Sequence, residues 1–270
     1  MKRLSIIFFI VVSSLVHTTI LAATTDQREL QTDERDGVHF TKLHDKVWMH
    51  TTYATIEGWG TFPSNGLIVL AENTAILVDT AWNNAQTDTI LSWARDVLGT
   101  PITSAVFTHA HDDKMGGVQS VKNFGASTYA HPLSNKLAPS EGVVPAEFDL
   151  IIADDGSATI PKGHPNTNLA DLEIFYAGAA HTVDNIVLKV SGTDILFGGC
   201  LIRQGGSTSL GNLGDASVPD WPETVRKIVA RFPNATMVIP SHGPPAGREL
   251  IALTAQLAKK AQTPNGPSGP

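Results

Sequence analysis

The middle of the chain carries a short cluster of side chains that suit a metal ion. His109 and His111 stand two residues apart, and the carboxylate of Asp113 follows after two more. Where a strand ends in such a sequence, the three side chains can point from one turn into a small volume. Imidazole and carboxylate groups are ligands that zinc accepts in proteins. A histidine pair of this kind is a weak signal by itself, so its support has to come from elsewhere in the chain.

Three further metal-binding side chains lie at comparable places in the sequence. His181, Cys200 and His242 each stand where a strand-like segment gives way to a loop, which is where the site residues of an α/β scaffold gather. Six ligands are too many for one tetrahedral zinc, whereas they suit two sites with three protein ligands each. A catalytic zinc site keeps one position open for water, and a structural site closes with four protein ligands. The set therefore indicates a hydrolase with two metal ions.

The elements that must position these residues form a repeated pattern. Residues 65–70 and 75–79 predict a hairpin of two buried strands, and residues 185–190 and 194–198 predict a second one. Each hairpin is followed by an amphipathic helix and then by a short apolar strand, which runs into His109 or His242. We expect an α/β fold, a four-layer αββα sandwich of two similar β-β-α-β halves, with the metal site at the strand ends between the sheets. Such units are common, so coincidence is the alternative to a true duplication.

Apolar spacing defines the two helices of the repeat. The expected buried face of the first comprises Ile90, Leu91, Ala94, Val97 and Leu98. That of the second comprises Val225, Ile228, Val229 and Phe232. Asp220 and Glu223, three residues apart, predict a capping box at the start of the second helix. Residues 139–170 predict loops and short hairpins between the halves, and residues 250–258 predict a last helix.

Composition and the first residues narrow the class of protein. The 270 residues carry a formal net charge of −7, which argues against nucleic acid as the main ligand. Lys2 and Arg3 precede an apolar run at 4–16, and small residues follow at Ala22 and Ala23, which is typical of a secretory signal cleaved near residue 22. Polar residues interrupt the run, so we expect no stable membrane anchor. We therefore expect a signal peptide at 1–22, a single domain at 23–262, a flexible tail at 263–270 and a periplasmic location.

The motifs together resemble the metallo-β-lactamase superfamily and, within it, the class B β-lactamases of subclass 1. The resemblance covers roughly residues 38–260 and rests on the segments 78–80, 109–113, 178–182, 198–200, 211–212 and 241–243. It implies two Zn²⁺ ions, the first held by His109, His111 and His181 and the second by Asp113, Cys200 and His242. The thioester hydrolases of the glyoxalase type usually carry histidine after the motif aspartate and aspartate at the position of Cys200. Lys114 and Cys200 therefore favour the lactamase.

The resemblance also implies a mechanism and a substrate. A water between two cations loses its proton near neutral pH, and the resulting hydroxide would attack the carbonyl of a β-lactam. Asp113 is expected to orient that hydroxide, and the Asn212 amide to hold the carbonyl oxygen together with the first zinc. Arg203 stands where many relatives carry lysine and is expected to grip the substrate carboxylate. Trp59, in the loop 54–64, is expected to pack on an apolar substrate group, and burial in the core is the alternative.

Supporting roles are expected for three polar residues near the ligands. Asp79 and Ser241 are candidates to hydrogen-bond the ligands or their loops, and Lys114 to balance charge below the second site. An ordinary structural role is the alternative for each. The expected function is hydrolysis of penicillins, cephalosporins and carbapenems by a monomeric enzyme that confers antibiotic resistance. The alternatives are a thioester or lactone hydrolase on the same scaffold and a periplasmic zinc-binding protein without catalysis.

Overall fold

The computed structural model describes residues 30–58, 60–161, 163–164 and 167–262. The expected signal peptide, Trp59 and the expected tail lie outside the described residues. The helices are α1 (Asn84–Asp96), α2 (Asp112–Met115), α3 (Val118–Asn123), α4 (Pro132–Leu137), α5 (Trp221–Arg231) and α6 (Glu249–Ala261), with the 3₁₀ turn η1 (Thr167–Asp171).

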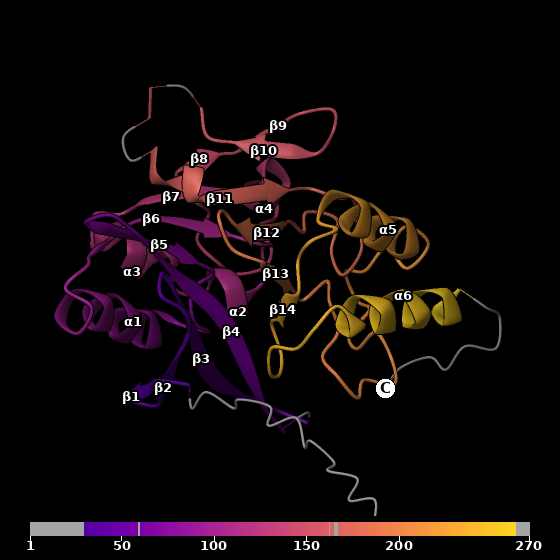
Figure 1. Ribbon diagram of the computed structural model, residues 1–270, viewed down its shortest axis with the longest axis horizontal. Coiled ribbons are helices and arrows are strands. Elements are labelled where there is room, and N and C mark those ends of the chain that lie inside the picture. Colours follow the sequence, from indigo (N-terminus) through magenta and orange to yellow (C-terminus); the bar gives the residue numbers. More distant parts are fainter. Residues whose placement is uncertain (1–29, 59, 162, 165–166, 263–270) are drawn as a thin grey trace, which may run out of the picture.

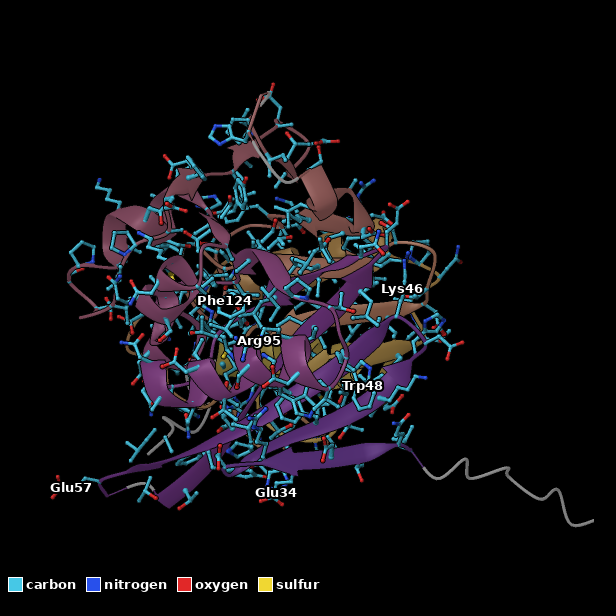
Figure 2. The ribbon with its side chains drawn as sticks, turned by 90° about the vertical axis from the view of Figure 1, so that its left-hand side faces the viewer. Glu34, Lys46, Trp48, Glu57, Arg95 and Phe124 are labelled. Carbon is cyan, nitrogen blue, oxygen red and sulfur yellow. The ribbon has the colours of Figure 1, made fainter. Side chains whose placement is uncertain are left out.

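Eight strands form the first sheet, in the order β1-β2-β3-β4-β5-β6-β7-β8. They are β1 (Thr32–Arg35), β2 (Val38–His44), β3 (Val47–Ile56), β4 (Gly60–Ala71), β5 (Thr74–Val78), β6 (Ile102–Phe107), β7 (Ser127–Ala130) and β8 (Phe148–Asp149). Neighbours from β1 to β5 pair antiparallel, and those from β5 to β8 pair parallel. The hairpin of β3 and β4 projects from the body with Glu57 at its tip (Figure 2).

Six strands form the second sheet, in the order β14-β13-β12-β11-β10-β9. They are β9 (Ile151–Ile152), β10 (Ser157–Thr159), β11 (Leu172–Phe175), β12 (Val187–Val190), β13 (Ile195–Gly199) and β14 (Met237–Pro240). All neighbours pair antiparallel except β13 and β14, which are parallel.

The two halves share a topology, as their sequence patterns predict. In the first, the hairpin β4-β5 leads through α1 to β6, and β6 pairs parallel with β5. In the second, the hairpin β12-β13 leads through α5 to β14, and β14 pairs parallel with β13. In both halves the strand after the helix lies beside the second strand of the hairpin, so its carboxyl end opens at the same edge of the sheet. This arrangement places the segments after β6, β13 and β14 near one another.

Three hydrophobic clusters fill the three interfaces of a four-layer sandwich, with α1 and α3 outside one sheet and α5 and α6 outside the other (Figure 1). Ile90 and Trp93 of α1 pack on the first sheet, where the Trp93 ring stacks on Phe40 at 3.8 Å. Val106 of β6 and Phe197 of β13 meet between the sheets. The predicted αββα architecture is confirmed.

Three details of the helices differ from the prediction. Asp220 precedes α5 but does not cap it, because its carboxylate accepts a hydrogen bond from the Ser217 hydroxyl, while Glu223 pairs with Arg226. Val97 and Val229 are exposed by 54% and 42%, since Val97 already follows the last turn of α1 and Val229 lies at the edge of the buried face of α5.

Among the described residues, no helix has the length and apolar character needed to cross a membrane.

Candidate metal centre

The ends of three strands and one loop deliver the six predicted ligands. His109 and His111 follow β6, and α2 begins directly afterwards, so that Asp113 lies in its first turn. Cys200 follows β13, and His242 follows β14 after one residue. His181 comes from the loop between β11 and β12.

Three imidazoles form the first group of possible ligand atoms. The rings of His109, His111 and His181 lie edge to face, with centroids 4.6 to 5.2 Å apart. His109 Nε2 is 3.1 Å from His111 Nδ1, and one ligand atom from each of the three residues lies within 4.8 Å of the others. The geometry matches the ligand set expected for the first zinc.

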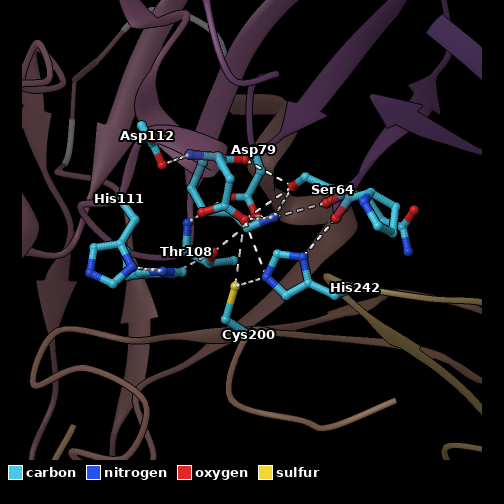
Figure 3. A network of polar contacts seen from close by, with 12 residues as sticks. Ser64, Asp79, Thr108, His111, Asp112, Cys200 and His242 are labelled. Carbon is cyan, nitrogen blue, oxygen red and sulfur yellow. Dashed lines mark hydrogen bonds and ion pairs between the residues drawn. The ribbon is translucent and has the colours of Figure 1, made fainter. Parts of the chain in front are cut away.

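A carboxylate, a thiol and an imidazole form a second group beside the first. The Cys200 sulfur lies 3.6 Å from Asp113 Oδ2 and 3.4 Å from His242 Nε2, and that nitrogen is 3.7 Å from Asp113 Oδ2 (Figure 3). His109 links the groups, because its ring nitrogen also lies within 4.8 Å of Asp113 and Cys200. The chain thus brings together all six residues.

Hydrogen bonds outside the two groups fix the direction of the imidazoles. His242 Nδ1 donates to the carbonyl oxygen of Pro63 at 2.7 Å, which turns Nε2 toward Cys200. His111 Nε2 lies 3.3 Å from Asp215 Oδ2, which turns Nδ1 toward His109. Metal-binding histidines are commonly held in this way, with the second ring nitrogen on a carbonyl or carboxylate oxygen.

A buried polar network lies beneath Asp113. Lys114 is fully buried, its Nζ lies 3.1 Å from Asp113 Oδ2, and it donates to the Ser64 hydroxyl at 2.7 Å. That hydroxyl in turn donates to Asp113 Oδ2 at 3.1 Å. Asp79 accepts hydrogen bonds from Thr108 N at 2.7 Å and Thr108 Oγ1 at 2.9 Å, and so holds the residue that precedes His109.

Asn65 connects this network with the opposite half. Its Nδ2 donates to the carbonyl oxygens of Pro240 at 2.9 Å and Gly243 at 2.7 Å, on both sides of His242. Its backbone N–H donates to Ser241 O, and its own carbonyl accepts from Lys114 Nζ. The turn that carries His242 is therefore fastened to β4.

Burial and charge set the protonation of the acids. Burial raises the pKa of Asp79 to about 7, although Lys114 and the hydrogen bonds from Thr108 lower it. Burial would also raise the pKa of Asp113, but the ammonium of Lys114 and the imidazoles of His242 and His109 hold it well below its usual range. Asp113 is thus an ionised carboxylate directed at the centre.

Three of the other ligands, His109, His181 and Cys200, are electrically neutral without a metal ion. Burial, with the neighbouring imidazoles, lowers the pKa values of His109 and His181 well below the usual value, so both rings are neutral. Burial raises the pKa of the Cys200 thiol, and the nearby carboxylate of Asp113 raises it further. Neutral imidazole is the form that binds metal, and a thiolate here requires a cation beside it. Hard and soft donors of this mixture suit zinc, so the residues present fit the metal that the sequence predicted.

A cavity of about 520 Å³ opens over both ligand groups, within the range of small-molecule sites. Arg203 and Asn212 line it, as do Ile56, Phe62 and Trp82, which give it an apolar wall. Arg203 lies against Gly211, where a Cβ atom would be 2.8 Å from Arg203 Nη1. The Asn212 side-chain oxygen accepts from Gly214 N at 3.0 Å, which leaves the amide nitrogen as the available donor.

Several contacts of the site escaped the sequence reasoning. Ser64, Asn65, Thr108 and Asp215 had no predicted role, yet they hold the ligands or their network. For Thr108, the sequence offers one indication of a role, namely its position directly before His109. Ser241 lies buried beside His242, and its backbone N–H donates to Gly199 O; its expected side-chain role stays a prediction.

The sequence profile described as "Metallo-beta-lactamase superfamily" matches residues 59–242.

Known proteins similar to this chain include two that share one name. "Metallo-beta-lactamase type 2" of Bacteroides fragilis is 36% identical over 252 residues, 93% of this chain and 95% of that protein. That of Bacillus cereus is 30% identical and covers 90% of this chain and 91% of its own length. A metallo-beta-lactamase structure from Erythrobacter litoralis superimposes with a TM-score of 0.82 at 45% identity, covering 85% of this chain and all of the other. FIM-1 from Pseudomonas aeruginosa, in a mono-zinc form, gives 0.79 at 50% identity, covering 86% and 99%.

Proposed function

The chain belongs to the metallo-beta-lactamase superfamily, and from this membership and the geometry of its ligand groups we propose that it is a zinc-dependent hydrolase that opens the amide bond of β-lactams. The observation that carries the proposal is the pair of adjoining ligand groups, three imidazoles beside a carboxylate, thiol and imidazole, at the floor of one cavity. Penicillins, cephalosporins and carbapenems are the proposed substrates, and antibiotic resistance is the proposed consequence.

Two zinc ions are the proposed cofactors. His109, His111 and His181 would hold one, and Asp113, Cys200 and His242 the other. When bound, zinc supplies a Lewis acid and lowers the pKa of water, so that a nucleophile is available near neutral pH. The division of six ligands into two groups, which adjoin at His109, supports a count of two.

Asp113 is the residue we propose to orient the attacking water. Its carboxylate is ionised and is held by Ser64 and Lys114 on one oxygen, so it can accept a hydrogen bond without changing its own position. A fixed acceptor removes the reorganisation that a mobile side chain would require at the moment of attack.

Asn212 and Arg203 are proposed to bind the substrate. The free amide of Asn212 can donate to the carbonyl oxygen as negative charge develops on it. Arg203 can bind the carboxylate of the substrate through two N–H groups, which fixes the ring over the ligands. Trp59, outside the described residues, keeps its proposed contact with an apolar substrate group.

Arg203→Ala tests the carboxylate contact separately from the chemistry. We expect KM to rise about 10-fold or more for carboxylate-bearing substrates, because a charge-assisted bidentate contact is lost, while kcat changes less. Arg203→Lys keeps the charge and should recover part of the loss. An unchanged KM in Arg203→Ala would remove this residue from the role.

A hydrolysis panel tests the proposed function as a whole. The purified protein is assayed against a chromogenic cephalosporin, a penicillin, a carbapenem and a set of thioesters and lactones, with and without a chelator. We expect chelator-sensitive opening of the β-lactams and little turnover of the others. Preferential thioester or lactone hydrolysis would replace the proposed substrate class, and bound zinc without any hydrolysis would leave a binding protein.

Export, a periplasmic location and a monomeric state are part of the same proposal. They rest on the signal-like residues 1–22 and on the enclosure of all six ligands within one chain. Cell fractionation with N-terminal sequencing of the mature protein tests the location, and sedimentation tests the monomer.

A further inference from the structure

A second, smaller cavity of about 140 Å³ adjoins the first at His111, which lines both. Its walls come from the segment after β6, from the end of α4 and the turn that follows, from the loop after His181 and from the loop that carries Asn212. The lining residues are Ala110, His111, Leu137, Glu141, Thr182, Val183, Asp184 and Asp215.

The polar groups of this second cavity are nearly all hydrogen-bond acceptors. Glu141, Asp184 and Asp215 contribute three carboxylates, and the described lining contains no lysine or arginine. Thr182 is 97% buried (3% exposed), and its hydroxyl oxygen has no hydrogen-bond partner among the described residues. A buried hydroxyl without a partner is costly unless a ligand supplies one. The cavity is therefore built to receive a donor that carries positive charge.

A bare metal ion fits these walls poorly. One ligand atom each from His111, Glu141 and Asp215 lies within 4.8 Å of the others. However, His111 directs Nδ1 toward His109, so its Nε2 carries the proton that faces Asp215. That nitrogen is then a donor and cannot bind a cation. The volume also exceeds what one ion fills, and it compares with a cavity that holds a benzene ring.

The side walls are apolar and suit carbon next to the charge. Leu137 and Val183 line the cavity, and Val183 keeps 42% of its surface exposed. An ammonium group on a short hydrocarbon would place its charge among the carboxylates and its carbon atoms against these two side chains. His111, which lines both cavities, is itself one of the ligands at the proposed site of reaction.

We propose that this cavity binds the ammonium group on the acyl side chain of an amino-substituted β-lactam, and that Glu141 is its principal specificity residue. The inference rests on the proposed function, because it assigns a part of that substrate. Glu141 is the suitable position to test, since it is exposed and its carboxylate forms no hydrogen bond or ion pair with another described residue, although one of its oxygens lies within 4.8 Å of a His111 nitrogen.

Two penicillins that differ in one amino group provide the experiment. Benzylpenicillin and its α-amino derivative ampicillin are compared by kcat/KM, and the ratio of the two values is followed in the wild type, Glu141→Gln and Glu141→Lys. We expect the ratio of ampicillin to benzylpenicillin to fall about two- to fivefold in Glu141→Gln, the range of a partly exposed ion pair, and further in Glu141→Lys. Benzylpenicillin turnover should stay as in the wild type. Glu147→Gln, the same change in the same segment but outside the cavity, is the control and should leave the ratio unchanged.

The outcomes separate this inference from the proposed function. If the wild type opens neither penicillin, the proposed function fails and the side-chain assignment fails with it. If both are opened and the ratio is the same in Glu141→Gln, Glu141→Lys and Glu147→Gln, only the second cavity is wrongly assigned. Native mass spectrometry of the zinc-loaded protein checks the rival occupant, because a third zinc that is lost in Glu141→Gln would overturn the ammonium.

Discussion

The buried ammonium of Lys114 provides a test of how the centre is held together. It lies 3.1 Å from Asp113 Oδ2 and 3.8 Å from Asp79 Oδ2, and its side chain is fully buried. Lys114→Met keeps the length and the apolar stem but removes the charge, so the carboxylate of Asp113 stays buried without that partner. Breaking a buried ion pair by removing one partner costs about 3–5 kcal/mol. We expect the free energy of unfolding of the metal-free protein to fall by this amount.

Urea denaturation in excess chelator, followed by tryptophan fluorescence, measures the loss. Lys189→Met is the matched control, because Lys189 Nζ lies 3.0 Å from Glu173 Oε1 in a pair that is partly open to solvent. Such pairs contribute about 0–1 kcal/mol. With zinc added, the loss in Lys114→Met should shrink, since a divalent cation facing Asp113 replaces part of the missing charge. If Lys114→Met and Lys189→Met unfold within about 1 kcal/mol of each other without metal, the ion pair does not support the site as argued.

Three further changes test other parts of the structure. Cys200→Ser should lose one of two zinc ions in native mass spectrometry and most of the activity while the circular dichroism spectrum persists; two retained zincs with full activity would contradict the second ligand group. Burial lowers the pKa of His50 to about 3, so protonation of the unfolded chain should destabilise the fold as the pH drops below about 6.5, by up to about 1.4 kcal/mol per pH unit down to pH 3. Urea unfolding of His50→Gln between pH 7 and pH 4 should show a shallower loss than the wild type, and parallel curves would refute this reading. Gly66→Ala should lower the free energy of unfolding by about 1–3 kcal/mol, because its Cβ would lie 2.3 Å from His50 Nε2 and 2.5 Å from Val78 O. Gly205→Ala is the control and should be neutral, since its Cβ would meet only an ordinary contact at 3.7 Å. Equal midpoints of the two variants in thermal unfolding would refute the clash at Gly66.

The architecture was predictable from the sequence because each strand and helix is specified by residues close to it in the chain. Alternating and continuous apolar runs specify strands and helices within a few residues of themselves. The convergence of Cys200 and His242 was also predictable, since they follow the parallel neighbours β13 and β14, whose carboxyl ends open at one edge of a sheet. The number of residues that separate these ligands in the sequence did not matter for this prediction, because the order of the strands follows from the repeated β-β-α-β unit. His109 follows β6 of the other sheet, so its approach to them depends on how the two sheets pack.

The contacts around the ligands were not predictable in the same way. Asn65 and Pro240 are 175 positions apart, and their hydrogen bond depends on how the two sheets pack. Asp215 lies in an irregular loop, where neither spacing nor periodicity indicates that it faces His111. At Asp220 a local rule failed for a local reason, because the Ser217 hydroxyl competes for the carboxylate. Sequence patterns therefore predicted which side chains come together at the centre, while their orientation depends on tertiary packing.

The parallel pairing of β5 with β6 and of β13 with β14 makes His109 and His242 counterparts of each other. Each histidine follows the last strand of its own β-β-α-β unit, so the two hold the same position in the two halves. The scaffold itself thus offers one equivalent imidazole from each half. The chemical difference between the two ligand groups arises from the other residues, because the first half adds His111 and Asp113 and the second adds His181 and Cys200. Because the repeated units position His109 and His242, the loop residues around them can be exchanged without moving these two imidazoles. The reactivity of the centre can therefore diverge while the fold that aligns them is kept.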